Sequence, residues 1–185
     1  MSDNKRFSAK KITVGALLAC IALTLFVLES MIPPPIPIPG IKIGLANTVT
    51  LCAFYFLDSA YAFMILTVRI ILANMFSGQA VSLMYSVCGG FLSYAAIYVL
   101  HGFFDKKSIW ALGVVSAVFH NAGQLLCACV VMGSAKVLKY GAVLGISACI
   151  TGTFTGLCAQ YVIWHFNKLF GGKQNDNRLQ QNGRK

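Results

Sequence analysis

The stretch ESMIPPPIPIPGIKIGLAN, residues 29–47, lies between the first two apolar segments of the chain and decides how they connect. It holds all five prolines of the sequence, which are Pro33, Pro34, Pro35, Pro37 and Pro39. Proline lacks a backbone N–H and interrupts helices, so this run predicts an extended connector. In polyproline geometry the run would cover on the order of 20 Å. Two interpretations follow: a preformed lid across the mouth of a cavity, or a stiff spacer that sets the angle between two helices.

The composition indicates a membrane protein. Of the 185 residues, 57% are hydrophobic and 11% are charged, whereas soluble domains carry about 25% charged residues. The apolar residues come in blocks of about 20, the length that crosses a bilayer. The first block, residues 12–31, is longer than the apolar core of a signal peptide, and no A-x-A-like cleavage site follows it. We therefore expect an all-α integral membrane protein whose first apolar block stays as a helix.

Six membrane-spanning helices are predicted, and their charged flanks orient them. The expected spans are residues 12–31, 42–57, 59–76, 80–101, 109–132 and 142–166. Basic residues gather before the first span, in the 102–108 loop and after the last span, which places both termini in the cytoplasm by the positive-inside rule. Trp110 and Trp164 then lie at the same inner interface, where indole rings are enriched. Residues 1–11 form a basic cytoplasmic segment, and the polar tail 167–185 is predicted to be disordered.

Composition and motifs disfavour several classes of function. The net charge of +10 comes mainly from residues that flank the spans, which fits contact with membrane lipid rather than with nucleic acid. The five acidic residues are scattered, so no carboxylate cluster is predicted to hold a metal or to catalyse a reaction. The sequence has no G-x-x-x-x-G-K-[ST] loop, so we expect no ATP hydrolysis by this chain. We expect a non-enzymatic protein with no catalytic residue, metal or cofactor.

Polar side chains at membrane depth form the predicted ligand site. Such residues are costly in lipid and are functional candidates by default. The predicted ligand-binding residues are Glu29, Lys42, Asn47, Arg69, Asn74, His120, Asn121 and Gln124. Their depths gather on the outer side of the bilayer, which predicts a cavity that opens to the outside. Two roles are open for Arg69: an ion pair with Glu29 that pins two helices, or an anchor for an anionic ligand, whose oxygens suit a guanidinium.

Small residues recur at intervals of four in three of the spans. They are Gly15 and Ala19 in the first, Ser82, Ser86 and Gly90 in the fourth, and Ala148, Gly152 and Gly156 in the sixth. This spacing lets helix backbones approach closely in lipid. The pattern predicts either packing inside the bundle or, on the first span, a surface for a partner subunit.

Four motifs together resemble a known family. They are ESMIPPPIPIPGIKIGLAN at 29–47, Arg69 followed by ANMFSG at 73–78, the GG pair at 89–90 and HNAGQL at 120–125. Over about residues 12–165 the chain resembles the Gx transporter family, whose members are often labelled heptaprenyl diphosphate synthase component I. That family is grouped with the substrate-binding S components of energy-coupling factor (ECF) transporters. The resemblance implies a multi-pass protein of the bacterial cell membrane, with a six-helix bundle of S-component type and an outward-opening ligand site beneath the loop after the first helix.

The resemblance also implies partners and a class of solute. The first helix would present Gly15, Ala19 and Ala22 to a transmembrane ECF coupling subunit driven by paired ATPases. Relatives found beside genes for flavin-linked electron transfer and quinones point to an isoprenoid-, quinone- or flavin-related solute, and the predicted site favours an acidic one. Prenyl diphosphate synthases carry DDxxD motifs, and this sequence has no DD pair. The alternatives are an accessory membrane subunit of polyprenyl diphosphate or menaquinone synthesis and a membrane scaffold for an electron-transfer complex.

Overall fold

The computed structural model describes residues 9–31, 44–77, 80–105 and 108–182, and within these ranges every regular element is helical. The elements are α1 (Ala9–Met31), α2 (Leu45–Phe56), α3 (Ser59–Ser77), α4 (Ala80–Leu100), η1 (His101–Phe103), α5 (Ile109–Met132), η2 (Ala135–Tyr140) and α6 (Gly141–Asn182). The predicted all-helical fold is therefore confirmed for the described residues. The five predicted proline positions and Lys42 lie outside the described residues.

Five of these helices are long and apolar enough to cross a membrane, and α2 is the exception. It has 12 residues, which span about 18 Å at 1.5 Å per residue. The hydrocarbon core of a bilayer is about 30 Å thick. The predicted second span, residues 42–57, thus contains a helix that covers only part of the membrane on its own.

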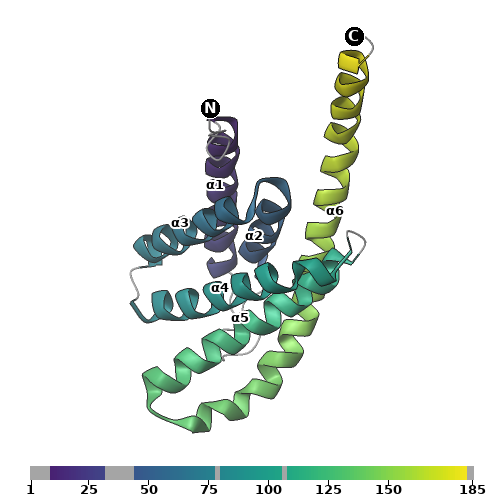
Figure 1. Ribbon diagram of the computed structural model, residues 1–185. Coiled ribbons are helices and arrows are strands. Elements are labelled where there is room, and N and C mark those ends of the chain that lie inside the picture. Colours follow the sequence, from purple (N-terminus) through teal and green to yellow (C-terminus); the bar gives the residue numbers. More distant parts are fainter. Residues whose placement is uncertain (1–8, 32–43, 78–79, 106–107, 183–185) are drawn as a thin grey trace.

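The start of α1 lies beside the turn between α2 and α3. The Lys11 Nζ lies 2.5 Å from Asp58 Oδ2 across these two segments. Figure 1 shows that α1 begins and α6 ends on the same side of the molecule. We call this side, where Lys11 meets Asp58, the terminal end. The predicted placement of both termini in the cytoplasm stays a prediction.

Close backbone contacts join α5 to its two neighbours. A Cβ atom added to Gly113 of α5 would lie 2.5 Å from the Cα of Gly156 in α6. On the other side of α5, a Cβ on Gly123 would lie 2.5 Å from the carbonyl oxygen of Cys88 in α4. Glycine permits both approaches because it has no side chain to hold the helices apart. In Figure 1, α4, α5 and α6 accordingly follow one another as adjacent antiparallel helices.

The small residues of α1 pack within the chain. Ala22 is fully buried, and Ala19 packs against the cluster formed by Ala53, Ala62 and Ile65. Gly15 faces α3 and the α2–α3 turn, since a Cβ there would lie 3.8 Å from the Tyr61 ring. Of the two interpretations of this face, the packing supports an internal contact, because α2 and α3 already cover the surface that was expected to meet a partner subunit.

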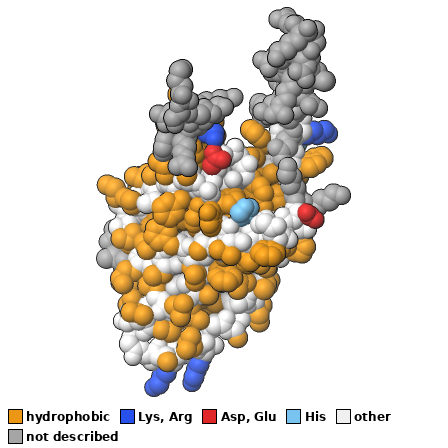
Figure 2. Space-filling model, in the orientation of Figure 1, with side chains coloured by type: hydrophobic (Ala, Val, Ile, Leu, Met, Phe, Trp, Pro, Cys, Tyr) orange, Lys and Arg blue, Asp and Glu red, His pale blue; other side chains and the backbone are white. Residues whose placement is uncertain are grey.

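A buried apolar core joins α2, α4, α5 and α6. Its members are Leu51, Cys52, Ile97, Ile109, Leu112, Ala159 and Ile163. Outside this core, many large apolar side chains are exposed, such as Val130 at 78%. Figure 2 shows apolar side chains over most of the visible surface, with charged side chains toward its ends. An apolar belt of this kind is what a lipid bilayer requires of the surface that it covers.

The last helix continues well past the bundle. The structure differs here from the predicted disordered tail, because α6 has 42 residues and ends at Asn182. Its polar part has no proline to stop a helix. Extending an existing helix costs far less than nucleating one, so the membrane-embedded part of α6 favours helix beyond residue 166. Figure 1 shows this extension projecting from the terminal end.

Candidate functional site

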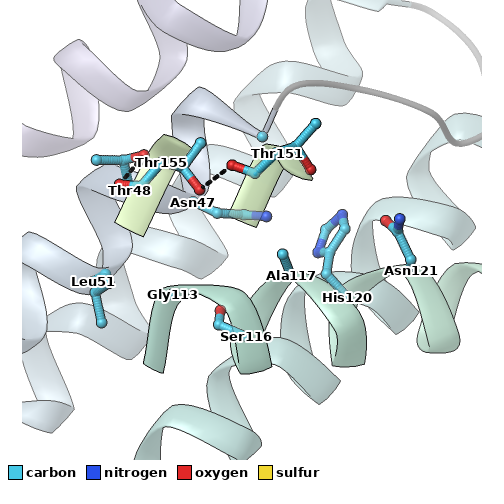
Figure 3. A pocket seen from close by; sticks show the side chains of 11 residues that line it. Asn47, Thr48, Leu51, Gly113, Ser116, Ala117, His120, Asn121, Thr151 and Thr155 are labelled. Carbon is cyan, nitrogen blue, oxygen red and sulfur yellow. Dashed lines mark hydrogen bonds between the residues drawn. The ribbon is translucent and has the colours of Figure 1, made fainter. Parts of the chain in front are cut away.

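A polar pocket lies between the start of α2 and the middle of α5 and α6. It is partly open to the outside of the protein and has a cavity volume of about 30 Å³. Its lining residues are Gly44, Asn47, Thr48, Leu51, Gly113, Ser116, Ala117, His120, Asn121, Thr151 and Thr155. Figure 3 shows these side chains arranged around the opening. No Asp, Glu, Lys or Arg is among these lining residues, so the pocket wall is polar without being formally charged.

Helix α5 contributes the side chains with the most hydrogen-bonding capacity. In Figure 3 the His120 ring stands between α5 and the start of α2, and Asn121 lies one residue further along. The Asn121 Nδ2 donates to the Leu144 carbonyl at 3.0 Å, which fixes the amide against α6. The hydroxyl of Ser116 lies 2.8 Å from that of Ser93 in α4. These contacts hold the α5 wall of the pocket in a set orientation.

The α6 wall presents hydroxyl oxygens. Thr151 donates its hydroxyl proton to the Ser147 carbonyl at 2.9 Å, and Thr155 donates to the Thr151 carbonyl at 2.9 Å. Because each proton is used within the helix, these hydroxyls face the pocket mainly as acceptors. The pocket therefore combines a ring and an amide on α5 with acceptor oxygens on α6.

The start of α2 is fixed by a carboxylate from α1. Gly44, just before α2, has a φ of 81°, a left-handed conformation that favours glycine. Its N–H donates to Glu29 Oε1 at 2.5 Å, and the Glu29 side chain is only 5% exposed. A carboxylate at this place is stabilised by the positive end of the helix dipole. Glu29 thus ties α1 to the first turn of α2.

Arg69 of α3 reaches the same turn from the other side. Its Nη2 donates to Asn47 Oδ1 at 3.4 Å, a long hydrogen bond. Arg69 is 5% exposed, and within the described part of the chain its buried Nε has no hydrogen-bond partner. Figure 3 shows the amide nitrogen of Asn47 turned toward His120. Arg69 therefore orients Asn47 so that an N–H donor faces the pocket.

Glu29 and Arg69 both contact the start of α2 but do not form a contact pair. Both side chains lie in the described part of the chain, and no ion pair within 4.0 Å joins them there. Glu29 holds Gly44 and Arg69 holds Asn47, so the two charges meet α2 at separate atoms. The direct ion pair with Glu29, one of the two roles predicted for Arg69, is therefore not formed between these described residues.

The structure brings only part of the predicted site together. Asn47, His120 and Asn121 line the pocket, and Glu29 and Arg69 contact its α2 wall. Lys42 lies outside the described residues.

The other two predicted residues lie apart from this pocket. Asn74 lines a separate crevice with Phe26, Ser82 and Ser86, between α1, α3 and α4. Gln124 is 7% exposed and packs against Gly89 of α4. The Gln124 Oε1 is buried without a hydrogen-bond partner among the described residues. Both side chains therefore belong to helix contacts rather than to the pocket lining.

Sequence reasoning missed the hydroxyl residues of the pocket, which are Thr48, Ser116, Thr151 and Thr155. Serine and threonine are common in membrane helices because they bond to their own helix backbone, so they give little signal. One signal was present: Thr151 and Thr155 have the same spacing of four as Gly152 and Gly156. The close packing at those glycines places the neighbouring threonines beside the pocket.

Comparison with known proteins identifies the family. No curated protein and no solved structure matches the chain. A family model described as heptaprenyl diphosphate synthase component I matches residues 18–162. The matched region runs from α1 into α6 and includes every residue that lines the pocket. The chain therefore belongs to the heptaprenyl diphosphate synthase component I family.

Proposed function

We propose that this protein is the solute-binding subunit of a membrane transport system and that it binds a small anionic solute in the pocket between α2, α5 and α6. The observation that carries the proposal is the Arg69 guanidinium, which is 5% exposed and has an unsatisfied buried Nε beside the pocket residue Asn47. A buried cation is costly unless it is paired and hydrogen-bonded. An anionic group would satisfy the free donor, because guanidinium groups suit carboxylate and phosphate oxygens.

The lining supports a compact solute. Asn47 and His120 offer hydrogen-bonding nitrogens, and the threonine hydroxyls on α6 offer acceptors. These groups would orient the body of a solute whose anionic end lies toward Arg69. The cavity volume is only about 30 Å³, which favours a small acid over a long isoprenoid chain.

The proposed orientation follows from the charges. Lys11 lies at the terminal end and Lys168 follows the last apolar part of α6. The positive-inside rule then makes the terminal end cytoplasmic, so the start of α2 lies in the outer half of a bacterial cell membrane. In this proposal an ECF coupling subunit and its ATPases supply the energy. They would bind a surface other than Gly15, Ala19 and Ala22, since that face packs inside the chain.

Native mass spectrometry of the mildly purified protein tests the proposal. We expect the wild type to retain a small acidic molecule and Arg69→Gln to lose it. Thr67→Val is the matched control, because Thr67 is on the same helix and donates its hydroxyl proton to the Phe63 carbonyl of that helix. Melting curves of the three proteins establish that each is folded. The proposal is wrong if wild type carries no solute, or if folded Arg69→Gln retains it as well as Thr67→Val does.

The family description favours a second candidate, an accessory membrane subunit of a prenyl diphosphate synthase. In this role the protein would position a soluble prenyltransferase or its product at the membrane. Reconstitution separates the two candidates. If adding the protein to such a prenyltransferase changes the length of the prenyl product, the accessory role is supported. An unchanged product length, together with a retained acidic solute, favours the transport role.

A further inference from the structure

We infer that Glu29 occupies the anion position of this pocket and that an anionic ligand binds by displacing the Glu29 carboxylate from the start of α2. The anion position is the place beside the Gly44 N–H and the Arg69 guanidinium. The inference rests on the proposed anion-binding function and adds an internal competitor to it. Three features of the described residues lead to it: the short helix α2, the incomplete bonding of Arg69 and the burial of Glu29.

Helix α2 presents a positive end to the pocket. It has 12 residues and its first turn lines the pocket through Gly44, Asn47 and Thr48. The N–H groups of a first helical turn have no partners within the helix, and they attract anions. Half-length membrane helices use the same end to bind anionic groups of a ligand. In this chain Gly44, at that end, already donates to Glu29.

The Arg69 guanidinium has hydrogen-bond donors that no described residue accepts from. A guanidinium has five N–H donors, yet Arg69 makes one 3.4 Å hydrogen bond to the neutral amide of Asn47 and leaves its buried Nε without a partner in the described chain. Carboxylates and phosphates usually bind a guanidinium through two parallel hydrogen bonds. Glu29 makes no ion pair within 4.0 Å with Arg69 in the described part of the chain. Glu29 therefore leaves the bonding positions of Arg69 unfilled.

Displacement follows from like-charge repulsion. Glu29 is 5% exposed, so its charge is weakly screened by water and would strongly oppose a second anion at the same donors. A ligand anion can make the two-point contact with Arg69 that Glu29 does not make. The ligand thus gains hydrogen bonds only if the Glu29 carboxylate leaves Gly44. Removing the charge of Glu29 should therefore strengthen anion binding rather than weaken it.

The sequence allows a direct measurement on the wild type. Glu29 is the only glutamate in the chain, so cell-free synthesis with carbon-13-labelled glutamate marks this one carboxylate. We expect inorganic phosphate, added to the full-length protein in neutral-lipid nanodiscs, to shift the infrared carboxylate band of Glu29. A second preparation, with phosphatidylglycerol in the nanodiscs and no added phosphate, tests a lipid headgroup as the source of the anion. A shift in either preparation supports displacement and identifies the source.

Measurements of anion affinity provide a second test of the inference. We expect Glu29→Gln to bind phosphate, or phosphatidylglycerol if that is the source, at least about tenfold more tightly than wild type. Asp58→Asn is the matched control: it removes the same charge from the exposed pair with Lys11 at the terminal end, and its affinity should equal that of wild type.

Two outcomes would contradict the inference. One is an infrared band of Glu29 that is unchanged in both preparations. The other is anion binding by folded Glu29→Gln that is no tighter than that of the wild type. If Glu29→Gln does not fold, the labelled wild type decides alone. Failure of the proposed function would instead appear as the absence of a retained solute in the purified wild type, which neither test measures.

Discussion

At the scale of single residues, two charged side chains fix the same helix turn without touching each other. Glu29 accepts from the Gly44 N–H, and Arg69 donates to Asn47. The two residues were predicted from the sequence as costly charges at membrane depth. Their separate targets were not predictable, because a contact of 4 Å depends on the rotation and tilt of three helices. The position of a residue in the sequence therefore predicts its depth in the membrane far better than it predicts which residues it contacts.

The hydrogen bond between Arg69 and Asn47 should stabilise the fold more than its length of 3.4 Å suggests. Asn47→Ala removes the hydrogen-bond partner that the buried Arg69 guanidinium has among the described residues, and losing a hydrogen bond to a charged group costs about 1.5–3 kcal/mol in unfolding free energy. Asn121→Ala breaks a shorter bond, 3.0 Å, to the neutral Leu144 carbonyl, so we expect a cost of about 1 kcal/mol. Unfolding titrations in detergent measure both values. A larger loss for Asn121→Ala than for Asn47→Ala would contradict the role given to Arg69.

At the scale of elements, glycine contacts set the position of α5 and therefore the width of the pocket. Gly113 lines the pocket and also meets the backbone of Gly156. The sequence predicted α5 with the bounds 109–132 that the structure has, because that segment is apolar throughout and is bounded by polar residues. The predicted second span, residues 42–57, begins outside the described residues, and its described helix runs from Leu45 to Phe56. The apolar residues before Leu45 continue the pattern of α2, whereas the described helix starts only after the left-handed Gly44.

Alanine substitutions in these two helices should separate packing from helix propensity. In Gly113→Ala the new methyl group would lie 2.5 Å from the Gly156 Cα, so the helices must move apart, which costs about 1–3 kcal/mol. Gly145→Ala meets no atom within 4 Å in the same hairpin, and it should stabilise the protein by about 0.5–1 kcal/mol through helix propensity. Thermal unfolding in detergent measures whether each substitution lowers or raises the stability of the protein. Equal effects at both positions would show that the α5–α6 contact is looser than described.

At the scale of the whole molecule, the number of crossings and the position of the ends constrain each other. Five full spans alone would put the two ends on opposite sides of a membrane, yet α1 begins and α6 ends on the same side. The described residues contain five helices long enough to cross a membrane and the shorter helix α2, so a sixth crossing that includes α2 stays a prediction.

Fluorescent-protein fusions at each end test this topology. Because both ends lie on one side and the basic residues favour the cytoplasm, green fluorescent protein should fluoresce at either end, whereas alkaline phosphatase should be inactive at both. A fusion at residue 134, in the segment between α5 and α6, should give the opposite pattern. Opposite results for the two chain ends would mean that the chain crosses the membrane an odd number of times.

The unbroken helix α6 has a mechanical consequence. Thr151 and Thr155 lie in the pocket, Gly156 touches α5, and the same helix runs on to Asn182. From Gly156 to Asn182 is about 39 Å at 1.5 Å per residue, whereas Thr151 is only about 8 Å from Gly156 along the axis. The pocket wall and the far end are thus parts of one continuous helix, which curves along its length in Figure 1. Under the proposed function, a shift of the pocket threonines on solute binding would be passed along this single backbone to the other side of the membrane.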